Sequence, residues 1–159
     1  MRCTIWLAAT LVLASGAEAQ PVKRMGPAES PIASSVEIPA GSRIVYVSGQ
    51  VPDPVNPAAP AGSATRFGDT ETQTRSVLGK IEAQLAQHGM GLGDIVMMRV
   101  FLVAPRGGLR MDFAGMMTAF RERFGTVAQP FKPARSTMEV SGLVDPDWLV
   151  EIEATAARK

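Results

Sequence analysis

Residues 94–103, DIVMMRVFLV, decide the fold of this chain. They form a nearly continuous apolar run rich in β-branched residues, which is typical of a central strand covered on at least one face. The chain has 159 residues, of which 46% are hydrophobic and 19% charged. Those values fit one globular domain that buries a single core around such a strand.

A helix is predicted on each side of this strand. Residues 69–89, DTETQTRSVLGKIEAQLAQHG, can be capped by Asp69 or Thr70 and ended by Gly89. Apolar residues recur there at helical spacing and form one stripe: Val77, Leu78, Ile81 and Leu85. A second helix is predicted over residues 110–125, with a Met- and Phe-rich stripe that is much more often core than a ligand site: Phe113, Met116, Met117, Phe120 and Phe124.

Short extended runs are predicted at both ends of the domain. They lie at residues 35–38 and 43–48, and again at 134–143 and 148–156, where VDPD is a turn signal between the last two. The resulting order is ββαβαββ, an α+β fold in which two helices cover one face of a four- or five-stranded sheet. Residues 52–68 contain four prolines, so we expect a long loop without strand or helix, of the kind that is often functional or mobile.

Charged residues alternate along the last two predicted strands. Since alternate residues of a strand point to opposite faces, each strand places its charges on one side. We expect the following charged and polar residues on the face that the helices leave uncovered, where other copies of the chain would pack: Arg135, Thr137, Glu139, Glu151 and Glu153.

The N-terminal residues are typical of an export signal. Arg2 precedes an apolar run, and Ala17-Glu18-Ala19 provides an A-x-A cleavage site before Gln20. The run is too short for a permanent membrane anchor. We therefore predict a signal peptide at 1–19, a flexible tail at 20–34 and a folded domain at 35–159, in a periplasmic or secreted protein without further membrane contact.

Composition excludes several kinds of site. The only cysteine, Cys3, lies in the predicted signal peptide, and the only histidine is His88, which we interpret as a C-terminal helix residue favoured by the helix dipole. A His/Cys metal site is therefore not expected, and neither is a thiol nucleophile. A net charge of +1 gives no indication of a nucleic-acid partner.

Five motifs make the sequence resemble the Rid family of reactive intermediate deaminases, also called YjgF and once L-PSP endoribonucleases. Over residues 32–157 they have the order and spacing of that family: YVSGQVP (46–52), GLGDIVMMRVFL (91–102), FRERFG (120–125), KPARSTMEV (132–140) and VEIEATA (150–156). The resemblance implies a chorismate-mutase-like α+β fold and a homotrimer with a cleft at each subunit interface. It also implies cofactor-free hydrolysis of 2-enamines and 2-imines to 2-keto acids and ammonia.

The resemblance also assigns site residues. Arg135 of the P-A-R motif would hold the substrate carboxylate, and Glu151 would serve the water or proton-transfer step. Ser48 and Thr137 would line the pocket, while Gly49 permits close backbone approach. Many deaminases of the family carry a tyrosine near the start of the domain, and Ser35 stands in its place here, which affects the expected substrate range.

The chemistry of an imino acid suits these residue types. A guanidinium offers a planar fork of donors that matches a carboxylate, and a partly desolvated carboxylate can move protons during imine hydrolysis. Taken without the family, a strand-face Arg135 is best interpreted as an ion-pair partner of Glu139, Glu151 or Glu153. Arg99 is a weaker candidate for ligand contact. Two other functions stay open: a keto-acid binding protein without turnover, and RNA cleavage, for which basic and stacking residues are scarce.

Overall fold

The structure, a computed structural model, describes residues 21–159. The predicted signal peptide, with Cys3, lies outside the described residues. The elements are β1 (Lys23–Met25), β2 (Ser35–Glu37), β3 (Arg43–Gln50), α1 (Ala64–Phe67), α2 (Thr70–Ala86), a 3-10 turn (Leu92–Asp94), β4 (Ile95–Leu102), α3 (Phe113–Arg121), β5 (Ala134–Glu139) and β6 (Val150–Arg158).

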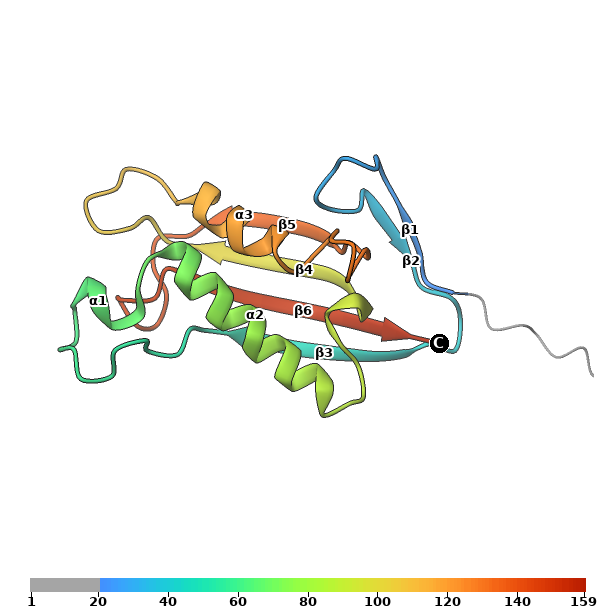
Figure 1. Ribbon diagram of the computed structural model, residues 1–159, viewed down its shortest axis with the longest axis horizontal. Helices are drawn as coiled ribbons and strands as arrows, with labels where there is room; N and C mark the ends of the chain where they lie inside the picture. Colours follow the sequence, from blue (N-terminus) through green and yellow to red (C-terminus); the bar gives the residue numbers. More distant parts are fainter. Residues whose placement is uncertain (1–20) are drawn as a thin grey trace, which may run out of the picture.

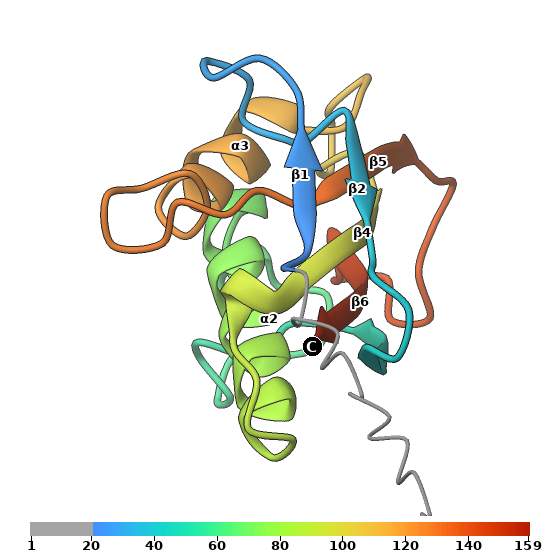
Figure 2. The ribbon, with the colours of Figure 1, turned by 90° about the vertical axis from the view of Figure 1, so that its right-hand side faces the viewer.

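Four strands form one sheet in the order β3-β6-β4-β5. β4 pairs in parallel with β5 and antiparallel with β6, which in turn pairs antiparallel with β3. α2 and α3 lie on one face of this sheet, and the other face carries no helix (Figures 1 and 2). The predicted α+β architecture, with two helices on one face, is therefore confirmed. The last two strands do not pair with each other, because β4 lies between them.

The core lies between α2, α3 and the covered face of the sheet. β4 contributes Met98, Val100 and Leu102, which are fully buried, and it presents Arg99 to the opposite face. The predicted helical stripes are buried as expected except at one position: Phe113, at the start of α3, is 44% exposed. Phe120 and Phe124 stack with ring centroids 4.5 Å apart, which closes the core at the end of α3.

Two segments expected to lack regular structure contain some. Of the tail predicted at 20–34, the described residues 21–34 are not free, because β1 pairs with β2 and the backbone N–H of Ala33 donates to Pro133 O at 3.0 Å. Within residues 52–68, α1 makes one helical turn whose N-cap is Ser63. Phe67 of that turn is buried and packs edge-on against Trp148, with ring centroids 6.5 Å apart, which holds the loop on the domain.

The face assigned to Arg135 from the sequence was wrong. In the register of the sheet, Arg135 lies beside Met98 and Thr137 beside Val100, so both point to the face that α3 covers. Glu139 lies beside Leu102 on the same face. Glu151 and Glu153 lie beside Phe101 and Arg99 on the open face, as predicted. The alternation within each strand was predicted correctly, but the face of the sheet to which β5 turns Arg135 was not.

Asp69 is confirmed as the N-cap of α2, and its removal should weaken the fold. Its carboxylate accepts from Thr72 N at 2.8 Å, and this hydrogen bond lowers the pKa of Asp69 from its ordinary value of 3.8. We expect Asp69→Ala to reduce the free energy of unfolding by about 1 kcal/mol at neutral pH, measured by urea denaturation.

The pH dependence follows from the direction of that shift. A lowered folded-state pKa means that the stabilisation is present above pH 3.8 and is lost as pH falls through the folded value. The difference between wild type and Asp69→Ala should therefore shrink in acid. Asp69→Asn is the matched control, since it keeps an acceptor but cannot titrate. Equal stability of wild type and Asp69→Ala at pH 7 would contradict this prediction.

Candidate functional site

Arg135 lies under α3 in an environment without acidic groups. Its guanidinium stands 4.3 Å from the centroid of the Phe120 ring and 5.9 Å from that of Phe113. Its Nη2 is 3.1 Å from the Met117 sulfur, and its Nη1 is 3.8 Å from the Met116 sulfur. Cation–π contacts and thioether sulfurs, which are weak acceptors, are the contacts that this cation makes.

The ion-pair role left open for Arg135 is not what the structure shows. Glu139 is paired with Arg110 at 3.0 Å, and Glu153 with Arg99 at 3.2 Å. No carboxylate within residues 21–159 forms a salt bridge with Arg135. A half-buried cation without a counter-charge destabilises the fold. Its presence here therefore indicates a site for an anionic ligand.

Two polar atoms on this face of β5 lack any partner. The Nε of Arg135 and the Oγ1 of Thr137 are buried, and neither forms a hydrogen bond with the described residues. Buried polar groups are nearly always satisfied in folded proteins, so two such atoms two residues apart on one strand need an explanation. A bound ligand or water held by β5 would supply it.

Burial changes the acidity of Arg135 without removing its charge. Desolvation by the surrounding apolar side chains, and secondarily the positive charge of Arg121, lower the pKa of Arg135 from its ordinary value to about 10. The guanidinium therefore remains cationic at neutral pH. Its electrostatic attraction to a carboxylate is stronger than that of an exposed arginine, since screening by water is reduced.

Glu151 and Gly49 form a second cluster, on the open face. β3 carries a bulge between Val47 and Gln50 where it pairs with β6, and bulges are frequent next to functional sites. A Cβ placed on Gly49 would lie 1.9 Å from Oε1 of Glu151, so only glycine allows this approach. Ser48 is exposed beside it and lines a cavity of about 230 Å³ together with Tyr46, Arg99 and Glu153.

Gly49→Ala should displace the Glu151 side chain. A contact of 1.9 Å is impossible, and because the atom it meets ends a flexible side chain, the carboxylate can swing away. We expect the variant to fold with little loss of stability but to lose whatever chemistry Glu151 performs. Gly142→Ala is the control, since a Cβ there meets nothing within 4 Å. Undiminished activity in Gly49→Ala would show that the position of Glu151 is unimportant.

The structure brings the sequence-predicted residues together in two groups. Arg135 and Thr137 lie on the covered face, while Glu151, Gly49 and Ser48 lie on the open face or its edge. One chain alone therefore does not place Arg135 opposite Glu151.

Of the remaining sequence candidates, Ser35 and His88 belong to neither group, and Arg99 lies next to the second. Ser35 is exposed at the start of β2. His88 is exposed just beyond α2, where its carbonyl accepts from Arg43. Arg99 is held by Glu153 on the open face, where it lines the same cavity as Ser48.

The residues around Arg135 were assigned only to the core from the sequence. Met116, Met117 and Phe120 lie in the helical stripe that was interpreted as packing alone, and each also contacts the guanidinium. The connectivity could have revealed them. A helix that joins two parallel neighbouring strands must pack over both, so α3 covers β5 as well as β4.

Residues 21–159 contain neither a candidate metal-binding cluster nor a candidate membrane-spanning helix. No group of three or more His, Cys, Asp and Glu side chains is arranged there to hold a metal ion. No helix in the same residues is both long and apolar enough to cross a bilayer.

Comparison with known proteins identifies similar chains. The profile of the family described as Endoribonuclease L-PSP matches residues 28–158. A RutC family protein of Pyrococcus abyssi is 36% identical over 115 residues, which cover 72% of this chain and 79% of that protein. The 2-iminobutanoate/2-iminopropanoate deaminase of Escherichia coli is 34% identical over 116 residues, which cover 73% and 80% of the two chains.

Solved structures show the same architecture. Escherichia coli TdcF with bound serine has a TM-score of 0.55 and 28% identity, over 86% of this chain and 99% of that one. The Rid-family protein YyfB of Yersinia pestis has a TM-score of 0.62 and 25% identity, over 86% and 98% of the two chains.

Proposed function

This chain belongs to the Endoribonuclease L-PSP family, which includes the Rid and YjgF proteins, and from that premise we propose that it hydrolyses reactive 2-imino and 2-enamino acids. The products are 2-keto acids and ammonia. Relatives at about a third identity are named deaminases of such compounds, which supports the reaction class. The α+β fold is that of YjgF structures.

The observation that carries the proposal is the unpaired guanidinium of Arg135. It is desolvated by Phe120 and the methionines of α3, it has no carboxylate partner among residues 21–159, and it stays charged at neutral pH. A substrate carboxylate would supply the missing counter-charge through two parallel hydrogen bonds. The solved TdcF complex contains serine, a small molecule with such a carboxylate.

The hydrolysis itself needs water and a group that moves protons. In our proposal Glu151 takes a proton from water as the water oxygen bonds to the imine carbon, and it returns that proton to nitrogen, which gives a carbinolamine. Glu151 then moves the hydroxyl proton to nitrogen while the carbonyl double bond of the keto acid forms. The carbon–nitrogen bond breaks and ammonia leaves, so the reaction consumes one water and needs no cofactor. Gly49 sets the position of the carboxylate, and Ser48 and Thr137 line the substrate pocket.

We propose that the site is completed between subunits of a homotrimer. Arg135 and Glu151 lie on opposite faces of the sheet in one chain, so a substrate that meets both must lie between two copies. The open face also exposes apolar side chains that a partner subunit would cover: Ile44, Tyr46 and Met138. Sedimentation that finds only monomer at micromolar concentration would contradict the trimer.

Imine hydrolysis by the purified protein tests the function. An amino-acid oxidase generates 2-imino acids from several amino acids, and a trapping amine reports the imine that survives. An amine oxidase supplies the matched imine without a carboxylate. We expect the protein to accelerate loss of the imino acids and to leave the carboxylate-free imine almost unaffected. Equal action on both would contradict a role for the Arg135 clamp.

Mixed subunits test the shared site. Chains carrying Arg135→Met and chains carrying Glu151→Gln should each be inactive alone. If the two residues of a site come from different chains, co-refolded mixtures contain sites with both wild-type residues and recover activity. Mixtures that stay inactive, although mass spectrometry shows mixed trimers, would place both residues in one chain's site.

Binding without turnover is the second candidate function. This function is favoured by the separation of Arg135 from Glu151. The contacts around Arg135 are complete within one chain, whereas Glu151 lies on the opposite face of the sheet. Calorimetry that shows 2-keto acid binding, with no hydrolysis of any imine by the intact oligomer, would establish it. Neither candidate function involves RNA. The absence of a nucleic-acid partner stays a prediction from the net charge of +1.

Export is also part of the proposal. The A-x-A sequence at Ala17–Ala19 supports cleavage before Gln20 and a periplasmic or secreted protein. Mass spectrometry of the protein recovered from its host should find Gln20 at the N-terminus. Recovery of the uncleaved chain in the cytoplasm would contradict this.

A further inference from the structure

A cavity of about 350 Å³ lies away from Arg135, between β1, the following loop and the segment that leads into β5. Most of its walls are apolar, and among them Phe131 supplies an aromatic ring. Two cations and no carboxylate line it. The lining residues are Val22, Arg24, Met25, Gly26, Pro27, Ile32, Ala33, Pro130, Phe131 and Lys132.

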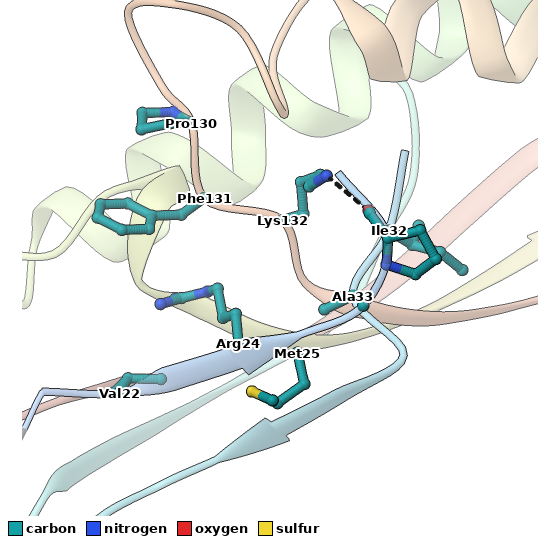
Figure 3. A pocket seen from close by; sticks show the side chains of 10 residues that line it. Val22, Arg24, Met25, Ile32, Ala33, Pro130, Phe131 and Lys132 are labelled. Atoms are coloured by element: carbon teal, nitrogen blue, oxygen red, sulfur yellow. Dashed lines mark hydrogen bonds between the residues drawn. The ribbon is translucent and has the colours of Figure 1, made fainter. Parts of the chain in front are cut away.

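Arg24 is the cation that has N–H donors without an acceptor among residues 21–159. Figure 3 shows it rising from β1 toward Phe131, and its guanidinium carbon is 4.9 Å from the centroid of that ring. Its Nη2 donates to Gly93 O at 2.8 Å. Within residues 21–159, its Nη1 donates to no protein acceptor, and its Nε is buried without one. The side chain is therefore held in place while part of its hydrogen-bonding capacity is unused.

Lys132 has a different role. Its ammonium donates to Ala28 O at 2.8 Å and to Ser30 O at 2.7 Å. It also lies 3.5 Å from Pro27 O, and Figure 3 draws that contact as a dashed line. Those contacts use its donors to hold the loop that forms one wall. Lys132 therefore adds positive charge to the cavity, and Arg24 is left as the group that can bind a ligand directly.

Asp94, whose charge acts on Arg24, does not neutralise it. The negative charge of Asp94 stabilises the Arg24 cation without direct contact. Both carboxylate oxygens of Asp94 accept from Arg158, and one also accepts from Gly91 N at 2.8 Å. Arg24 forms no salt bridge with any residue of the described chain. Burial lowers its pKa, which is the expected response of a cation that lacks a close counter-charge.

We propose that this cavity is a second binding site, for a small carboxylate with an apolar or aromatic body. The carboxylate would bind the free donors of Arg24, and the body would lie against Phe131 and the aliphatic walls. This division between one charged anchor and apolar walls is usual for small-molecule sites. The site does not depend on the deaminase activity, although Ala33 in its wall is bonded to Pro133, two residues before Arg135.

Calorimetric titration with 3-phenylpropanoate tests the proposal, with 3-phenylpropanamide as the neutral isostere. The protein carries Arg135→Met throughout, so that binding at Arg135 does not contribute. We expect one carboxylate per chain and roughly ten- to hundredfold weaker binding after Arg24→Met. Lys23→Met is the matched control, since it removes one charge from the neighbouring position of β1, where the side chain is 53% exposed.

Three results would overturn the proposal: no binding of the acid, equal affinity for acid and amide, or equal affinity in Arg24→Met and Lys23→Met. Should Arg24→Met fail to fold, Phe131→Ala replaces it, since Phe131 is 53% exposed and its truncation leaves the core intact. Unchanged affinity in that variant would equally contradict the site. Failure of imine hydrolysis with binding intact would affect only the proposed function.

Discussion

Arg135→Met is expected to abolish imine hydrolysis while making the folded chain more stable. The catalytic loss should be at least about 100-fold in kcat/KM, because the substrate loses the group that orients its carboxylate. The gain in stability should be about 1 kcal/mol, since an apolar side chain of similar length replaces a desolvated cation that has no counter-charge. The new methionine would pack against Met116, Met117 and Phe120.

Thermal or urea unfolding at one protein concentration, combined with the imine assay, measures both effects. Arg121→Met is the matched control, because it removes the same charge from the exposed end of α3 and should change neither quantity much. A functional residue is expected to lower the stability of the fold where its charged group has no partner until a ligand binds. If Arg135→Met proves less stable than Arg121→Met, Arg135 has a structural partner and the clamp loses its main support.

Glu151→Gln is expected to cause the second large loss, of roughly 100- to 10,000-fold in kcat. Glutamine keeps the size of the side chain and its place beside Gly49, but it cannot accept a proton from water. Binding of a 2-keto acid should remain, because Arg135 is untouched. Steady-state kinetics together with keto-acid titration separates the two effects.

Glu153→Gln is the control for this substitution. Glu153 lies two residues along β6 on the same open face and carries the same charge, but it is paired with Arg99. Its neutralisation should leave turnover near the wild-type rate. Similar losses in both variants would indicate that the open face needs its total negative charge, and that Glu151 has no particular role.

Local periodicity was sufficient to predict the longer elements. α2 was predicted from one apolar stripe between a cap and a glycine, and β4 from an uninterrupted apolar run. These predictions are confirmed, because such patterns depend only on the burial of one face against a neighbouring layer. β1 has three residues and α1 four, too few for any periodic pattern to emerge, and both were missed.

The candidate site was predicted as a set of residues and not as an arrangement. The motifs around Ser48, Arg135 and Glu151 identified which side chains to examine. The contact of Gly49 with Glu151 and the apolar cover over Arg135 join residues about 100 and about 20 positions apart in the chain. No local pattern contains such pairings.

The sequence by itself determined that Arg135, Thr137 and Glu139 share one face of a strand, because alternate side chains always do. Only the tertiary structure decided which face that is. The choice depends on β5 pairing in parallel with β4 beneath α3, and on β6 lying between β3 and β4. Both pairings join distant parts of the chain, and a shift of one residue in the register of a strand moves all of its charges to the opposite side of the sheet.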